Sequence, residues 1–325
     1  MECKICGNRK ENKEFKIKEM MFGFKDEFAY IKCSKCGCLF IKEIPENMSK
    51  YYPSDFGSFD DFTKGLKNLI MQLAKREISR YTIFNRGFVG RLFYKSFLHT
   101  SPASLSHINI KLSKDSRILD VGCGSGSFLY ALSELGFINL LGIDPYIEKD
   151  ICYKNGLNVI KKSICDVEQR KYNLIMFHHS FEHIADPLQT LSCVNNLLSS
   201  DGTCLIRIPV IDQWAWRNYK TNWVQIDAPR HFFLHSIKSM KILAENAGLE
   251  IKHIVYDSYE LQFYGSEQYK RDIPLRAKNS YLIEPSKSIF SKKEIKIFKE
   301  SAKKLNSKND GDQAAFYLKK ISTGF

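Results

Sequence analysis

The sequence predicts an α/β protein whose core is a doubly wound, mostly parallel sheet of seven strands, preceded by a small cysteine-rich module. From residue 111 to about 256, strand-like and helix-like segments alternate. A last strand-like segment, AAFYLKKI, follows near the end of the chain, and two Cys-x-x-Cys pairs lie within the first 44 residues. Alternation of this kind indicates a parallel sheet with helices on both faces.

Residues 1–44 are expected to form a zinc-binding module. The ligands would be the two pairs Cys3, Cys6, Cys33 and Cys36. Two Cys-x-x-Cys turns can close a tetrahedral four-sulfur site, which leaves no open position for catalysis and therefore indicates a structural role. Cys38 is a competing ligand, and redox pairs are the alternative. Of the ten cysteines, we expect ligands or buried thiols rather than disulfides.

Residues 45–110 are expected to form a helical and aromatic cap. Two segments have helical spacing and basic faces: TKGLKNLIMQLAKREISRYTIF (63–84) and RGFVGRLFYKSFL (86–98). A tyrosine-rich loop, YYPSDFGSFDDF, precedes them.

Residues 111–325 are expected to form the main domain, with insertions at 211–235 and 257–290. The expected strands are SRILDVG, NLLGIDP, LNVIKKS, YNLIMFH, GTCLIRIP, LEIKHIVYDSY and AAFYLKKI. The expected helices are SFLYALSELG, DPLQTLSCVNNLLSSDG, IKSMKILAENAG with Ser236 as N-cap, and SKKEIKIFKESAKKL.

Three glycines follow the first strand of this domain, in the stretch ILDVGCGSGSFL. Gly122, Gly124 and Gly126 let the backbone approach a ligand closely, at the carboxyl ends of the strands, where open α/β sheets bind ligands. Dinucleotide sites use the spacing G-x-G-x-x-G, whereas here it is G-x-G-x-G. Asp120 would repel a pyrophosphate and suits a ligand with a cationic end.

This pattern resembles motif I of the class I S-adenosylmethionine (SAM)-dependent methyltransferases, and the resemblance extends over residues 117–210. It implies a Rossmann-like fold, SAM as cofactor and S-adenosylhomocysteine as product. By this resemblance, Asp120 faces the ligand's amino group and Asp144, followed by Pro145, binds the ribose hydroxyls. Asp166 accepts from the adenine amino group beside Val167, and His179 and Ser180 lie next to the methionine part.

A broader resemblance covers most of the chain. The four-cysteine module, the YYP…F.SF stretch, PRHFFLHS and GDQAAFYL together resemble methyltransferases of surface-polysaccharide and modified-sugar pathways. The resemblance implies a nucleotide-linked or phosphorylated sugar as acceptor. Zinc-carrying sugar C-methyltransferases are similar in their first part but usually have a further C-terminal domain. We therefore expect methylation at oxygen, with C-methylation as an alternative.

A sugar hydroxyl needs a base to take its proton, and histidine suits this task near pH 7. The candidates are His183 with Glu182, His231, and His179 near the cofactor; Arg230 could hold a phosphate. The tryptophans of the 211–235 insertion are a candidate acceptor platform, or the core of that insertion: Trp214, Trp216 and Trp223. HSFEH also matches the inverted zinc-protease motif His-x-x-Glu-His, but it ends a buried strand rather than lying on a helix.

The charge favours anionic partners. Lys and Arg number 49 against 36 Asp and Glu, a net charge of +13. This charge also suits an RNA methyltransferase that uses the zinc module and basic helices as its RNA platform. A SAM-binding scaffold without enzymatic activity is a third hypothesis. The chain has no apolar run long enough to span a bilayer and no signal-peptide pattern at its start, so we expect a soluble, cytoplasmic protein.

Overall fold

The computed structural model describes residues 1–53, 69–85, 87, 88, 90, 105 and 110–321. Most of the expected helix at 86–98 and most of the tyrosine-rich loop therefore lie outside the described residues. The chain divides into two units, which are described separately. The first comprises Met1–Ser54, Phe181–Leu191 and Arg207–Phe316; the second comprises Asp55–Ser180, Ser192–Ile206 and Tyr317–Phe325. The first unit thus groups the N-terminal residues with two later parts of the chain.

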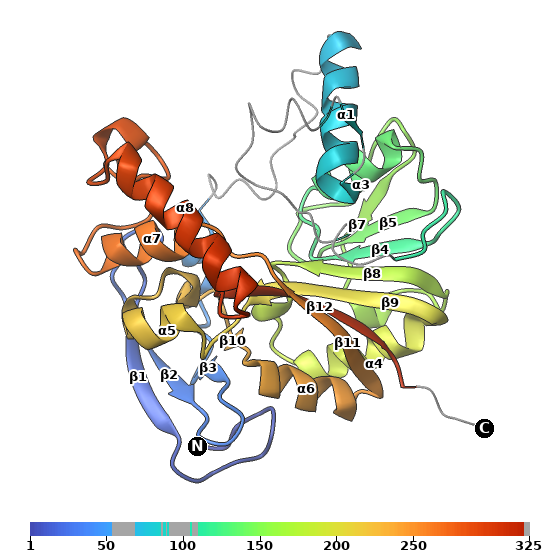
Figure 1. The fold of residues 1–325 in the computed structure, drawn as a ribbon. Helices are drawn as coiled ribbons and strands as arrows, with labels where there is room; N and C mark the ends of the chain where they lie inside the picture. Colours follow the sequence, from blue (N-terminus) through green and yellow to red (C-terminus); the bar gives the residue numbers. More distant parts are fainter. Residues whose placement is uncertain (54–68, 86, 89, 91–104, 106–109, 322–325) are drawn as a thin grey trace. The chain divides into compact units, whose positions relative to one another are not determined.

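The larger sheet has the strand order β11-β12-β9-β8-β4-β5-β7-β6. Its strands are β4 (Ile118–Val121), β5 (Leu140–Ile143), β6 (Ile151–Cys152), β7 (Asn158–Ile160), β8 (Tyr172–His178), β9 (Leu198–Pro209), β11 (Leu249–Tyr256) and β12 (Gln313–Lys320). Strand β4 pairs in parallel with both β5 and β8, and β5 pairs in parallel with β7. These neighbours lie side by side in Figure 1.

The sheet confirms the α/β prediction but has eight strands rather than seven. The additional strand is β6, which pairs antiparallel with β7 through only two residues. So short a strand shows no alternation of apolar and polar residues, which is why the sequence pattern did not indicate it.

In the second unit, buried apolar side chains of the central strands form the core. All four residues of β4 are buried, and β8 is buried from Leu174 to Phe177. Helix α3 (Ser127–Glu134) follows the glycine loop, and helix α1 (Leu69–Phe84) packs near it, with the ring of Phe84 stacked on Phe137 at 5.7 Å. Helix α4 (Pro187–Leu197) ends earlier than predicted because β9 already begins at Leu198.

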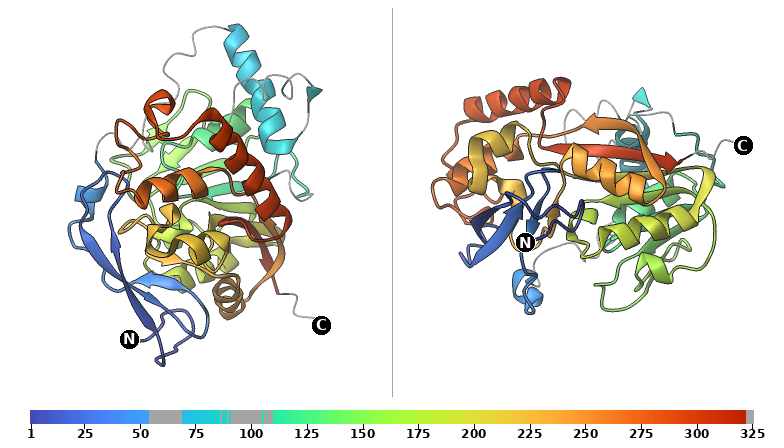
Figure 2. Two further views of the ribbon diagram at one scale, coloured as in Figure 1. Left: turned by 60° about the vertical axis from the view of Figure 1, so that its left-hand side comes forward. Right: turned by 90° about the horizontal axis from the view of Figure 1, so that it is seen from below.

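The first unit contains a four-stranded sheet of order β1-β2-β3-β10. Its antiparallel strands are β1 (Lys13–Lys18), β2 (Glu27–Lys32), β3 (Leu39–Ile41) and β10 (Phe233–Leu234). The first three, drawn in blue, lie side by side in both views of Figure 2. Strand β10 lies much later in the sequence than the other three strands. The N-terminal module therefore shares a sheet with the segment that carries His231.

Helices complete the first unit. They are α5 (Trp214–Tyr219), α6 (Ile237–Asn246), α7 (Leu261–Tyr269) and α8 (Lys292–Ser307), with 3₁₀ turns at Met48–Tyr51, Phe181–His183, Lys220–Asn222, Val224–Ile226 and Pro285–Lys287; a further such turn, Ile164–Asp166, lies in the second unit. Ser236 caps α6 and Ser291 caps α8, each through a reciprocal capping box. The prediction of Ser236 as N-cap is thus confirmed. None of the described helices is both long and apolar enough to cross a membrane.

Candidate active site

The glycine loop of the second unit connects β4 to α3. Gly122, Gly124 and Gly126 have φ angles of 69°, 55° and 81°, a region that residues with a Cβ rarely adopt. A Cβ on Gly122 would also lie 2.4 Å from the Cβ of Ser180. The loop therefore requires glycine for both conformation and space, and it opens the N-terminus of α3 as expected for a ligand loop.

Two carboxylates lie beside this loop. Asp120, in β4, is 3% exposed, and Asp144 follows β5 and is 6% exposed. Burial and the negative charge of Asp144 raise the pKa of Asp120 to about 8. A cationic ligand would lower this raised pKa, because a positive group near a buried carboxylate stabilises its charged form. The loop and the two carboxylates therefore fit a ligand with a cationic end.

Asp144 also holds the loop itself. Its carboxylate accepts hydrogen bonds from the backbone N–H of Gly124 at 2.9 Å and of Tyr146 at 2.8 Å. Each carboxylate oxygen keeps a lone pair for a further donor. Pro145 and Tyr146 are exposed, and the large exposed ring of Tyr146 is a feature that the sequence reasoning did not single out.

The segment predicted to hold the adenine contains Asp166 and Val167. Asp166 is exposed at the end of a 3₁₀ turn, and Val167 is 9% exposed next to it.

Cys165, adjacent to Asp166, forms a disulfide bond with Cys193 of α4. The expectation that the cysteines form no disulfide is wrong for this pair: their Cα atoms are 5.4 Å apart, within disulfide range, although 28 residues separate them in the sequence.

His179 and Ser180 follow the end of β8. His179 is exposed and has a φ of 52°, an uncommon backbone conformation for histidine. Ser180 is half-buried, and its hydroxyl donates to the carbonyl of Val121 at 2.6 Å, which ties the end of β8 to the end of β4. Both residues therefore lie at the carboxyl end of the central strands.

In the first unit, His183 and His231 form a pair. Their ring centroids lie 4.8 Å apart and their planes are 73° from parallel. The Nδ1 atom of His183 lies 2.8 Å from the carbonyl of Arg230, and that of His231 lies 2.8 Å from the carbonyl of Gln225. A carbonyl can only accept, so each Nδ1 carries the proton and each Nε2 offers a lone pair. Both histidines are thus fixed in the tautomer that can accept a proton at Nε2.

Two buried carboxylates accompany the histidine pair. The Nε2 atom of His231 lies 3.9 Å from Glu182, which is fully buried, and 3.8 Å from Asp227. Burial and the charge of His183 lower the pKa of His231 to about 4. His231 is therefore neutral at pH 7, whereas His183 is half-buried and more accessible. The ligand atoms of Glu182, His183 and His231 lie within 4.8 Å of one another, a set that could also hold a metal ion.

Arg230 does not have the role expected for it. Its side chain is fully buried and forms ion pairs with Glu19 at 3.0 Å and Asp227 at 2.5 Å. It also donates to the carbonyl of Tyr51 at 2.9 Å. The Nε, Nη1 and Nη2 atoms of this buried guanidinium all donate to acceptors of the protein, so the side chain is not accessible to a phosphate. We therefore correct this prediction. Arg230 instead connects the N-terminal module to the segment that carries His231.

The three tryptophans do not form one platform. Trp223 is 1% exposed and its indole N–H donates to Asp312 at 2.8 Å, so it belongs to the core of the insertion. Trp216 is 5% exposed and packs edge-on against Phe15 at 5.3 Å. Trp214 is half-buried and packs against Phe263 at 5.2 Å.

The four predicted zinc ligands come together in the N-terminal module. Their sulfur atoms all lie within 4.8 Å of one another, with Cys3 and Cys36 at 3.6 Å and Cys6 and Cys33 at 3.6 Å. A zinc ion with Zn–S bonds of about 2.3 Å places its sulfurs about 3.8 Å apart, so the cluster fits tetrahedral zinc. Hydrogen bonding with Cys36 lowers the pKa of Cys3 to about 5, toward the thiolate that binds metal. The fully buried Cys38 is not part of this set.

The N-terminal module fixes the position of His231. Strand β3 pairs with β10, with Phe40 opposite Phe233. The hydroxyl of Tyr30 donates to the carbonyl of His231 at 2.9 Å. The sequence does not indicate this connection or the role of Glu19, because hydrogen bonds between distant segments produce no local pattern. Asp227 was also missed, although its spacing of three residues from Arg230 and four from His231 is a local signal.

Comparison with known proteins identifies the domain. Residues 94–254 match the protein family described as "Methyltransferase domain". The chain is 27% identical over 122 residues to the ubiquinone biosynthesis O-methyltransferase of Glaesserella parasuis, which covers 33% of this chain and 51% of that protein. It is 25% identical over 150 residues to the tRNA U34 carboxymethyltransferase of Aliarcobacter butzleri; this alignment covers 42% of this chain and 48% of that protein. The chain thus spans about half the length of the curated relatives it matches.

Among solved structures, a SAM-dependent methyltransferase from Archaeoglobus fulgidus aligns with 64% of this chain and 86% of its own, at 19% identity and a TM-score of 0.39. The two curated relatives are not described as sugar methyltransferases. The family match and the glycine loop with its two carboxylates lie on the same part of the chain. The chain therefore carries, within residues 94–254, a methyltransferase domain with the class I SAM-dependent fold.

Proposed function

We propose that this methyltransferase transfers a methyl group from SAM to a hydroxyl oxygen of an anionic small molecule, such as a nucleotide-linked or phosphorylated sugar. The observation that carries the proposal is the histidine pair: His183 and His231 each offer Nε2 as a proton acceptor beside buried carboxylates. A hydroxyl is a poor nucleophile at neutral pH, so its methylation benefits from such a base.

SAM supplies an electrophilic methyl group bonded to a sulfonium sulfur. The acceptor oxygen forms a bond to the methyl carbon while the carbon–sulfur bond breaks and its electron pair returns to sulfur. Nε2 of His183 takes the hydroxyl proton, because His183 is the more accessible of the two rings. His231 is a positioning residue, since its lowered pKa of about 4 makes it a weak base.

The residues of the second unit would hold the cofactor. We assign Asp120 to the ammonium group and Asp144 to the ribose hydroxyls, with the glycine loop against the methionine part. Asp166 and Val167 would contact the adenine, and His179 and Ser180 would lie near the methionine end. Only two residues separate Ser180 from His183 in the chain, so the proposed base follows directly on the proposed cofactor segment.

The four-cysteine cluster would bind one structural zinc ion. Four thiolates fill a tetrahedral site, so the metal would have no open position for substrate. Because β3 pairs with β10, the metal would stabilise the strand that carries the His231 segment.

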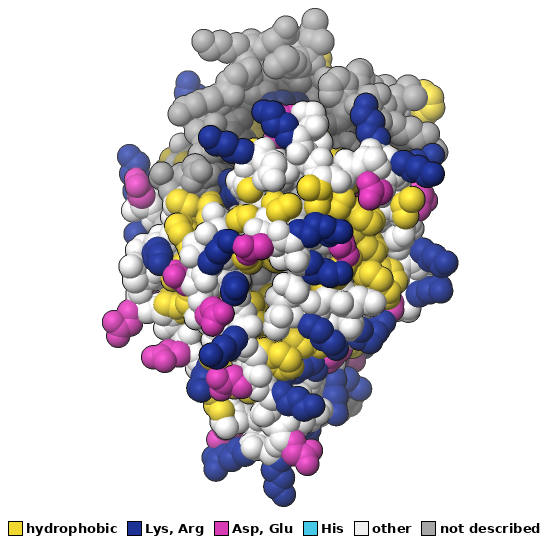
Figure 3. All heavy atoms as spheres, turned by 90° about the vertical axis from the view of Figure 1, so that its left-hand side faces the viewer, with side chains coloured by type: hydrophobic (Ala, Val, Ile, Leu, Met, Phe, Trp, Pro, Cys, Tyr) yellow, Lys and Arg dark blue, Asp and Glu magenta, His cyan; other side chains and the backbone are white. Residues whose placement is uncertain are grey.

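An RNA acceptor is the second candidate. The net charge of +13 and the similarity to a protein described as a tRNA U34 carboxymethyltransferase favour it. On the face shown in Figure 3, however, Lys and Arg side chains are dispersed among acidic, apolar and uncharged ones. A track for an RNA backbone is more often a continuous basic stripe.

One experiment separates these acceptors. SAM with a labelled methyl group is added with the purified protein to a lysate of a strain that lacks the gene, and small molecules, RNA and protein are then separated. We expect label in the small molecules, attached to oxygen. Label in RNA would overturn the acceptor assignment, label on carbon would favour the C-methyltransferase alternative, and no label in any fraction would favour a SAM-binding scaffold.

A further inference from the structure

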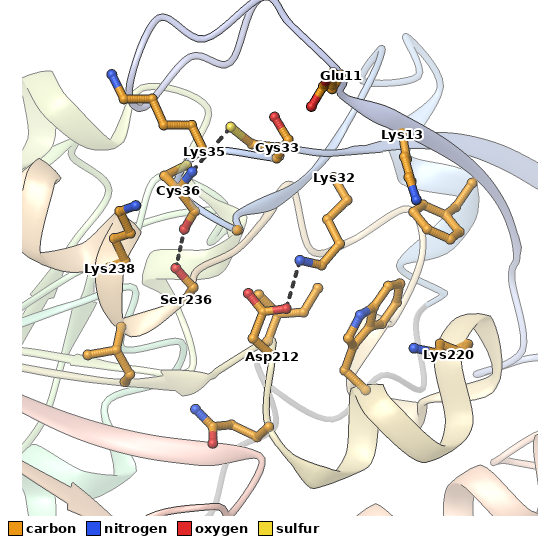
Figure 4. A pocket seen from close by; sticks show the side chains of 17 residues that line it. Glu11, Lys13, Lys32, Cys33, Lys35, Cys36, Asp212, Lys220, Ser236 and Lys238 are labelled. Carbon is orange, nitrogen blue, oxygen red and sulfur yellow. Dashed lines mark hydrogen bonds and ion pairs between the residues drawn. The ribbon is translucent and has the colours of Figure 1, made fainter.

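A pocket of about 700 Å³ lies in the first unit beside the four-cysteine cluster. Strand β1, the Cys33–Cys36 turn, residues 211–220 and the first turn of α6 form its walls (Figure 4). Its volume is in the range of small-molecule sites, which is about 300–1,000 Å³. Neither His183 nor His231 lines it, so the proposed methyl transfer does not account for it.

The pocket is rich in positive charge. Five lysines line it: Lys13, Lys32, Lys35, Lys220 and Lys238. Only two carboxylates line it, Glu11 and Asp212, and Asp212 pairs with Lys32 at 2.7 Å. Within the described part of the chain, Lys13, Lys220 and Lys238 form no ion pair. Zinc bound to four thiolates would add a charge of −2, and the pocket would still be net positive.

The lysines are arranged around one space. In Figure 4 the side chains of Lys13, Lys32 and Lys220 lie around the cavity, and a dashed line joins the ammonium of Lys32 to Asp212. They come from β1, from the end of β2 and from the turn after α5. Lys32 is paired with Asp212, whereas Lys13 and Lys220 have no ion pair within the described residues. Like charges that face one cavity repel one another, and an anion between them removes that repulsion.

The floor of the pocket is aromatic. Phe15 and Trp216 both line it and pack edge to face at 5.3 Å, and the ammonium of Lys220 lies 5.8 Å from the Trp216 ring. Because Trp216 is only 5% exposed, its position is fixed before any ligand binds. A rigid apolar floor below a ring of ammonium groups suits a ligand with a flat ring at one end and phosphates at the other.

We propose that this pocket binds a small molecule in which a diphosphate is joined to a ring, as in a nucleoside diphosphate. Lys13 and Lys220 contact the phosphates, Lys32 lies beside them in its pair with Asp212, and the ring lies against Phe15 and Trp216. The proposal goes beyond the methyl transfer and does not depend on which acceptor is methylated.

The test is calorimetric titration of the zinc-loaded full chain with UDP, ADP, inorganic pyrophosphate and uridine, at an ionic strength of about 0.15 M. The diphosphates should bind at one site per chain, pyrophosphate more weakly and uridine not measurably. The variant Lys13→Ala/Lys220→Ala should raise the Kd for UDP at least about tenfold, because two charge-assisted contacts are lost.

The matched control is Lys16→Ala/Lys241→Ala, which removes the same charge. Lys16 points to the other face of β1, and Lys241 lies further along α6, pairing with Glu245 at 3.9 Å. The control should change the Kd less than about twofold, and both variants should bind SAM as the unaltered chain does. The proposal is overturned if neither diphosphate binds or if both variants weaken binding equally. Displacement of UDP by a short RNA of higher affinity would likewise overturn it, in favour of an RNA surface.

Discussion

Asp120 is buried beside the glycine loop, and its pKa is raised to about 8 by burial and by Asp144; we assign it to the cationic end of SAM. At pH 7 the carboxyl of the ligand-free chain is therefore mostly protonated. An ammonium group nearby favours the ionised form and lowers the pKa. Binding of SAM should then expel a proton below pH 8, and this release should fade as the pH rises above 8, where the carboxyl has already ionised.

Calorimetry at pH 7 in two buffers of different ionisation enthalpy measures this release. We expect close to one proton released per SAM bound. Asp120→Asn should release none and should bind SAM about tenfold or more weakly, because a hydrogen bond between charged groups is worth about 1.5–3 kcal/mol. An apparent binding enthalpy that is the same in both buffers would contradict the assignment of Asp120 to the cationic end.

His183 should be required for turnover but not for cofactor binding. Because general-base catalysis contributes about 10²–10⁴-fold, His183→Ala should lower kcat by that factor while the Kd for SAM stays within about twofold. His183→Gln keeps a similar size and should be equally slow. The rate of labelled methyl transfer gives kcat, and a separate titration with SAM gives the Kd.

The pH–rate profile separates the two histidines. His231 has a pKa of about 4, so it is neutral throughout the range above pH 5 and its protonation does not limit the rate there. An acid limb of kcat/KM near pH 4 in the unaltered enzyme would assign the base to His231 and contradict the role of His183. His231→Ala should reduce the rate through mispositioning and leave the pH at which the acid limb falls unchanged.

At the scale of elements, the four-cysteine module and strand β10 act together. The pairing of β3 with β10 and the hydrogen bond from Tyr30 to the carbonyl of His231 both depend on the fold of the module. Metal binding supplies folding free energy to such small modules. Removal of zinc, or Cys33→Ser/Cys36→Ser, should therefore abolish methyl transfer while SAM binding by the second unit stays within about twofold.

Elemental analysis measures the number of zinc ions bound per chain. The unaltered chain should hold one zinc ion and the double-serine variant none, whereas Cys152→Ser, at an exposed cysteine outside the cluster, should keep one. Two metal ions per chain would mean that Glu182, His183 and His231 also bind metal. That result would contradict the assignment of His183 as a base with a free Nε2.

Elements with strong local signals were predictable from the sequence. Strand β8 begins and ends at the predicted residues, and Ser236 caps α6 as expected, because a continuous apolar run and a helix cap are both set by neighbouring residues. The glycine loop after β4 was predictable for the same reason. The Cys165–Cys193 bond and the ion pair of Arg230 with Glu19 were not predictable, because their partners are brought together only by the fold. The ion pair of Arg230 with Asp227, three residues earlier, is local in the sequence and could have been expected.

For the whole molecule, the net charge of +13 leaves the acceptor open between a small anion and RNA. The two differ in how many ions they release on binding. A protein that makes 6–10 phosphate contacts loses about 10³–10⁵ in affinity between 50 and 200 mM salt. A small molecule with one diphosphate replaces far fewer ions, and its affinity should fall less than about tenfold over the same range.

The salt dependence of KM for whichever fraction accepts the labelled methyl group therefore tests the proposed function even while the acceptor is chemically unidentified. We expect a shallow dependence, with the Kd for SAM nearly constant, since the residues to which we assign SAM, Asp120 and Asp144, are buried and not part of the exposed surface. A steep rise in KM with salt, together with protection of bulk RNA from nuclease, would show that the surface lysines bind a nucleic-acid backbone. In that case the charge of the chain, and not the histidine pair, would identify its substrate.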